Sequence, residues 1–136
     1  DFITPGNPLF GMEYDQFVRG CHLGIFPSYY EPWGYTPLEC VARGIPAITS
    51  DLSGFGAYVQ KVMPEHEEHG IYVTPRRHAS YEDSAAKLAD WLFDIVRMDR
   101  RDRIRQRNRV ESISEQFDWT HLASHYDEAH ARAAAV

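Results

Sequence analysis

The sequence is poor in cysteine and has no long apolar run. Cys21 and Cys40 are its only cysteines, and neither stands in a CxxC or CxxxH pattern. This excludes a disulfide framework and gives no zinc-ligand spacing, so we expect two reduced, buried thiols. No apolar stretch approaches the roughly 18 residues of a membrane span, and no signal peptide is recognisable. We therefore expect a protein of the cytoplasm with no membrane partner.

The charge of the chain is acidic on average but uneven. Its 14 basic and 20 acidic side chains give a net charge of −6, which disfavours general binding to nucleic acid. The 43% of hydrophobic residues are enough for the core of a folded domain. One segment differs: residues 97–109 hold seven arginines and two aspartates, a local charge of +5, and leave −11 on the rest.

Short apolar segments alternate with helix-like segments in the first half of the chain. Because strands separated by single helices pair in parallel, this pattern predicts an α/β fold with a Rossmann-like parallel sheet and flanking helices. Three strands are fewer than a doubly wound domain carries, and the chain starts without methionine. We therefore expect a piece of a longer domain. The expected strands are 22–27, 47–50 and 70–74; the expected helices are 36–43 and, after a turn at 51–56, a segment ending near Val62.

The second half is expected to be helical. Ser80, with Asp83 three residues on, nearly matches a capping box and begins a long helix. A break is expected near residues 117–119, with a final helix from Thr120. We divide the chain into an α/β part, residues 1–79, and a helical part, residues 80–136. The apolar face of the long helix is predicted to hold Leu88, Trp91, Leu92, Ile95 and Val96.

Residues 28–39 are the segment richest in chemistry. They follow a strand and open a helix, which is where α/β sheets bind ligands. We expect Thr36 as the N-cap and Pro37 at the first helical position, while Gly34 lets a ligand approach the backbone. The free N–H groups of residues 35–38 and the positive helix end suit a phosphate.

Two glutamates in this segment have competing interpretations. Glu31 suits contact with a sugar hydroxyl or a developing cation, or is a solvated loop carboxylate. Glu39 completes Thr36-x-x-Glu39, a capping box that would merely close the helix start. Paired carboxylates also suggest glycoside hydrolysis, but spacing along the chain does not give the through-space separation that this mechanism needs.

The histidines give no convincing metal site. His66 and His69 flank two glutamates, yet the segment follows a proline and precedes a strand. We expect a solvated loop there and no bound metal.

A family resemblance narrows these alternatives. Glu31-x7-Glu39 is the pattern of retaining glycosyltransferases with the GT-B fold. The wider sequence resembles the glycogen synthases of animals and fungi (glycosyltransferase family three) in one register from about Tyr14 to Trp119. The segments that carry the likeness are residues 18–37, Leu52-Ser53-Gly54-Phe55-Gly56, Gly70-Ile71-Tyr72 and residues 100–109.

The resemblance implies transfer of glucose from UDP-glucose to the non-reducing end of an α-1,4-glucan such as glycogen. Configuration would be retained, and no metal or other cofactor is implied. It places Glu31 beside the transferred glucose, as the catalytic carboxylate, and Glu39 on the ribose. The other implied substrate-binding residues are Tyr14 on the uracil, Trp33 and Gly34 on the glucose hydroxyls, and Tyr35 and Thr36 at the diphosphate.

The resemblance also implies missing parts. In the family, the basic residues that neutralise the leaving diphosphate, and the N-terminal domain that closes over the donor, precede this stretch. Charge stabilisation and water exclusion are large parts of such catalysis, so we expect these 136 residues to be inactive alone. Two alternatives stay open: a non-catalytic remnant that binds nucleotide sugars or serves assembly, and a retaining transferase with another donor.

The arginine segment suggests a second, phosphate-binding surface. On a helix, Arg100, Arg103 and Arg107 lie within about 60° of one another, and arginine makes forked contacts to phosphate. In the resembled family this cluster senses glucose 6-phosphate near the subunit contacts of a tetramer, so a homo-oligomer is implied. A solvated helix and a nucleic-acid-binding helix are the alternatives; the second predicts steep salt dependence. The predicted allosteric residues are Arg100, Arg101, Arg103 and Arg107, while Asp102 and Arg105 depart from the family's usual run.

Overall fold

The chain folds around a small parallel sheet. The computed structural model describes residues 3–135, so residues 1, 2 and 136 of the expected domain lie outside the described part. The sheet has three parallel strands in the order β1 (Gly24–Ile25), β2 (Ala47–Ser50) and β3 (Ile71–Thr74). The strands fall inside the predicted segments, and the α/β fold class is confirmed.

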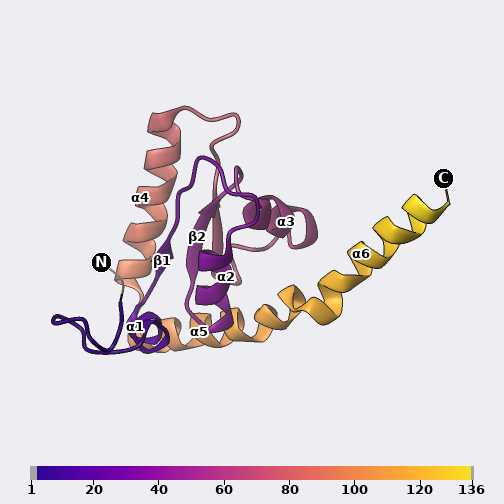
Figure 1. The fold of residues 1–136 in the computed structure, drawn as a ribbon. Coiled ribbons are helices and arrows are strands. Elements are labelled where there is room, and N and C mark those ends of the chain that lie inside the picture. The colour runs from indigo at the N-terminus through magenta and orange to yellow at the C-terminus, as the bar shows by residue number, and fades with distance from the viewer. Residues whose placement is uncertain (1–2, 136) are drawn as a thin grey trace.

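Helices cover both faces of this sheet. In Figure 1, α4 lies along one side, α2 and α3 lie on the other, α5 runs across one end, and α6 extends away from the body. α2 packs against β2, and α4 packs against β3. The helices are α1 (Tyr14–Gly20), α2 (Tyr35–Ala42), α3 (Gly54–Val62), α4 (Tyr81–Arg97), α5 (Arg100–Ser114), the short η1 (Glu115–Phe117) and α6 (Trp119–Ala134).

Two apolar clusters hold the layers together. Side chains alternate between the faces of a strand, so Ile71 and Val73 join the larger cluster, which includes residues of α2, α3 and α5. Tyr72 points the other way and packs with Ile48 and with Trp91 of α4. A strand buried on both faces needs apolar residues at successive positions, which explains the continuous apolar run of β3.

The C-terminal half departs from the prediction at one point. The expected long helix is two helices, because Asp99 caps α5 by accepting a hydrogen bond from the Asp102 amide at 2.8 Å. Arg97 therefore belongs to α4. Val96 is 77% exposed, so its placement on the apolar face is wrong. The Val96 side chain is rotated about 100° around the helix from that of the buried Ile95. At the other end of α4, Ser80 is the N-cap, as predicted.

Two other predictions on buried groups need correction. His66 is buried, with Nδ1 2.8 Å from the carbonyl oxygen of Ile71, so the solvated-loop prediction is wrong for this residue. Cys40 is buried as expected, whereas Cys21 is only half-buried; both thiols are free. Within residues 3–135, no group of three or more His, Cys, Asp or Glu side chains is arranged to hold a metal ion. No helix in that range has the length and apolar character to cross a bilayer.

Candidate functional site

The loop between β1 and α2 is fixed against the start of α3. Glu31 forms an isolated parallel bridge with Ser53. The Gly54 amide donates to the Glu31 carbonyl at 3.0 Å, and the Phe55 amide donates to the Trp33 carbonyl at 2.7 Å. A Cβ on Gly54 would lie 2.1 Å from the carbonyl oxygen of Pro32, so only glycine permits this approach. The loop is thus held by its backbone.

Glu31 lies in this fixed loop with its carboxylate close to the start of α2. Its Oε2 accepts a hydrogen bond from the Ser28 hydroxyl at 3.2 Å, and a Cβ built on Gly34 would lie 3.6 Å from the same oxygen. The side chain is half-buried. A freely solvated loop carboxylate is therefore not what the structure shows. Ser28 is a partner that sequence reasoning missed, although its spacing from Glu31 was a usable signal.

The start of α2 differs from the prediction. Gly34 is the N-cap, with φ of 113°, and no side chain caps the helix. This left-handed conformation suits glycine, so the helix begins at Tyr35, before Thr36. Thr36 is therefore not the N-cap, and Pro37 stands at the third helical position, where a missing N–H still costs nothing. The capping-box interpretation of Glu39 is wrong.

Tyr14 and Glu39 come from different helices and meet at one side of α2. Burial raises the pKa of the Tyr14 hydroxyl above its ordinary value, the neighbouring Glu39 carboxylate raises it further, and Arg43 opposes both. Tyr14 and Glu39 are half-buried. Two residues predicted to bind the nucleoside are thus neighbours in the fold.

Arg76, at the carboxyl ends of the strands, is a further residue that sequence reasoning missed. It follows β3, and its guanidinium donates to the Pro27 carbonyl at 2.9 Å and lies 4.0 Å from the centre of the Tyr29 ring. The carboxylate of Asp51, just after β2, accepts hydrogen bonds from the backbone amides of Arg76 and Arg77. The segments that follow all three strands are therefore tied together.

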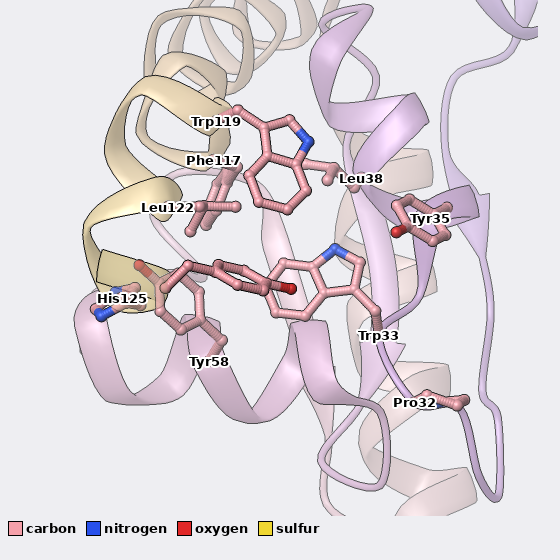
Figure 2. Close-up of a pocket in the computed structure, with 10 residues that line it drawn as sticks. Pro32, Trp33, Tyr35, Leu38, Tyr58, Phe117, Trp119, Leu122 and His125 are labelled. Atoms are coloured by element: carbon pink, nitrogen blue, oxygen red, sulfur yellow. The ribbon is translucent and has the colours of Figure 1, made fainter. Parts of the chain in front are cut away.

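An aromatic groove lies beside the loop. Trp33, Tyr58, Phe117 and Trp119 line this groove (Figure 2). Its volume is about 390 Å³. The Trp33 ring is 5.7 Å from that of Tyr58 and 5.9 Å from that of Phe55. The Trp33 ring therefore packs on α3.

The predicted allosteric arginines divide into two pairs. Arg100 and Arg101 are exposed at the start of α5. Arg103 and Arg107 are half-buried and donate to the carbonyls of Met98, at 3.0 Å, and Arg19, at 3.3 Å.

Helix α5, which carries the predicted allosteric arginines and is called the arginine helix below, lies at the far end of α2 from the Glu31 loop. A Cβ on Gly44, just beyond the C-terminus of α2, would lie 3.4 Å from the carbonyl oxygen of Arg107. The backbone N–H groups of Gly44 and Ile45 donate hydrogen bonds to the carbonyls of Val41 and Cys40, which closes that end. The Glu31 loop and the predicted allosteric arginines are therefore at opposite ends of α2.

Comparison with known proteins identifies the family. The model of the family described as glycogen synthase matches residues 1–136, the whole chain. The chain belongs to the glycogen synthase family. It is 48% identical over 131 residues to glycogen [starch] synthase isoform 1 of Saccharomyces cerevisiae and 49% identical over 129 residues to the liver glycogen [starch] synthase of Mus musculus. It is also 49% identical over 126 residues to the glycogen [starch] synthase of Caenorhabditis elegans.

These matches cover nearly all of the chain but little of each relative. They span 95% of the chain for the yeast and mouse proteins and 93% for the nematode protein. The same matches span 18% of the length of the yeast and mouse relatives and 19% of the nematode one. The expected resemblance to the animal and fungal glycogen synthase family is confirmed for this stretch.

Proposed function

We propose that the chain is the donor-binding part of a retaining glycosyltransferase. The transferase would move glucose from UDP-glucose to the non-reducing end of an α-1,4-glucan such as glycogen. The observation that carries the proposal is that Tyr14 neighbours Glu39 of α2 while Glu31 lies at the start of the same helix, in a chain of the glycogen synthase family. The proposed setting is the cytoplasm.

Each site residue has a proposed role that its position supports. Tyr14 stacks on the uracil ring and Glu39 accepts hydrogen bonds from the ribose hydroxyls. The unpaired N–H groups that begin a helix, here at residues 34–36, and the positive helix end favour the diphosphate. Trp33 and Gly34 contribute backbone groups to the glucose hydroxyls. Tyr35 stands at the exposed first position of the same helix.

Glu31 is the proposed catalytic carboxylate. As the bond between the anomeric carbon and the diphosphate breaks, positive charge develops on the sugar ring, and a carboxylate held nearby stabilises it. The backbone bonds to α3 and the Ser28 hydroxyl hold Glu31 in place before substrate arrives. Such preorganisation avoids the cost of ordering the loop during the reaction.

The arginine face of α5 is a proposed regulatory site. We propose that Arg100, Arg101, Arg103 and Arg107 bind the phosphate of glucose 6-phosphate, and that the full-length protein is a homo-oligomer. Four arginines on fewer than three helical turns of a domain with negative net charge form a local cationic surface that suits a small phosphorylated sugar.

The test of the main proposal is titration calorimetry with UDP. The wild-type full-length protein should bind UDP, and Glu39→Ala should weaken that affinity about tenfold or more, because hydrogen bonds to a charged group are among the stronger ones. Glu65→Ala, which alters an exposed glutamate before β3, is the matched control and should bind normally.

Three outcomes separate the alternatives. Absence of UDP binding by the wild type would contradict a donor site, and a preference for ADP would indicate another donor. The 136-residue chain alone is expected to transfer no glucose; measurable transfer by it would show that the rest of the transferase is dispensable.

A further inference from the structure

One guanidinium joins the two helices that carry Tyr14 and Glu39. Arg43, the C-cap of α2, forms an ion pair with the Asp15 carboxylate of α1. Its other terminal nitrogen donates to the carbonyl oxygen of Glu39 at 2.7 Å. The Arg43 side chain is only 20% exposed, whereas that of Asp15 is 59% exposed.

The partners of this guanidinium stand next to the proposed nucleoside contacts. Asp15 directly follows Tyr14 in α1, and the accepting carbonyl belongs to Glu39 itself. Of the ion pairs within residues 3–135, this is the one that links α1 to α2. Arg43 therefore fixes the distance between the backbone segments from which Tyr14 and Glu39 project.

α1 depends on such contacts for its position. It has seven residues, of which Val18 is the buried one. A helix this short is unstable by itself in water and takes its position from tertiary packing. Without the ion pair, α1 would keep the apolar contacts of Val18, Tyr14 and Phe17 but lose its ionic connection to α2.

We propose that Asp15 and Arg43 are positioning residues, which hold Tyr14 beside Glu39 and thereby preorganise the nucleoside end of the donor site. This inference rests on the proposed function. An ion pair with one exposed partner contributes little to global stability. Its effect is therefore expected in the affinity for donor and not in the melting temperature.

The experiment measures steady-state kinetics of the full-length protein with UDP-glucose and glucan. Asp15→Asn and Arg43→Met should each raise KM for UDP-glucose about three- to fivefold, the size expected for one partly exposed ion pair. The value of kcat should stay unchanged, because Glu31 and its loop are untouched. Asp15→Glu keeps the carboxylate and should restore most of the affinity.

A control and a second ligand distinguish positioning from a structural role. Arg19→Met makes the same chemical change at an exposed position of α1 and should leave KM unaltered. Inhibition by inorganic pyrophosphate, which lacks the nucleoside, should be equal in wild type and variants. A lower melting temperature with equal loss of UDP and pyrophosphate binding would overturn the proposal, as would an unchanged KM in both variants. Failure of the wild type to bind UDP would instead contradict the proposed function itself.

Discussion

Cys40 is a buried thiol in the helix that carries the proposed donor site. It is 4% exposed, and a Cβ on Gly24 of β1 would lie 2.8 Å from its sulfur. Burial raises the pKa of Cys40 from 9.0 to about 11, with Cys21 adding to the rise and Arg43 opposing it. Because the thiolate is the reactive form, Cys40 is expected to be chemically inert near neutral pH.

The raised pKa makes the contribution of Cys40 to stability depend on pH. The protonated thiol stabilises the fold fully below pH 9, and this contribution is lost as the pH rises from 9 through about 11. Wild type and Cys40→Ala should therefore differ more in urea midpoint at pH 7 than at pH 10.5. Other titrating groups change the stability of both proteins alike, so their effect cancels in the difference between the two urea midpoints. A difference that stays constant between the two pH values would contradict the burial of this thiol.

Residue pairs distant in sequence were beyond sequence reasoning. Glu31, Glu39 and Tyr14 were predicted from the family pattern, because each stands in a recognisable run. The pairing of Asp15 with Arg43 has no local signature, since 28 residues separate them and only the packing of α1 on α2 brings them together. Arg76 was missed for the same reason, since its partner Pro27 lies 49 residues earlier.

Individual elements were predictable where the signal is local. Gly44 ends α2 with φ of 69°, and Ser80 begins α4, both as expected from capping chemistry. The start of α2 was misplaced because threonine is a better N-cap than glycine by propensity, while the fold selects the left-handed Gly34. The helix break at Asp99 was not predicted, because Asp99 stands among many charged residues and was not recognised as an N-cap.

The close contact between α3 and the Glu31 loop gives a prediction about how these two elements pack. Gly54→Ala should destabilise the protein by about 1–3 kcal/mol, because the added methyl group would overlap the Pro32 carbonyl and force the loop away. The measurement is urea unfolding followed by circular dichroism. Gly20→Ala is the control, since nothing lies within 4 Å of a Cβ there and alanine favours the helix. Equal stability of the two variants would contradict the close approach.

At the scale of the whole molecule, α2 connects the two proposed functional regions. Its N-terminus faces the Glu31 loop, and its C-terminus lies against the arginine helix α5. Helix α6 has no buried residue and extends away from the body (Figure 1). The domain division at residue 79 stays a prediction, although α5 of the helical part shares a core with α2 and α3.

The proposed regulatory site predicts a thermal shift. Glucose 6-phosphate should raise the melting temperature of the full-length protein, and Arg103→Ala/Arg107→Ala should remove that rise by deleting two phosphate contacts. Arg97→Ala is the control, because Arg97 belongs to α4 and lies outside the arginine helix. An unaltered shift in the double variant would rule out this site. Binding of RNA that weakens steeply with salt and ignores the sugar would favour the nucleic-acid alternative.

The strand order of the sheet is also its order of synthesis. Because β1, β2 and β3 are neighbours in chain order, each strand can pair as it leaves the ribosome without displacing an earlier one. Domains form during synthesis at about 5–20 residues per second. The larger core, however, needs Val110, Ile113 and Phe117, which are made after all three strands. A nascent chain would therefore carry a paired sheet whose larger core stays open at one end until α5 emerges to close it.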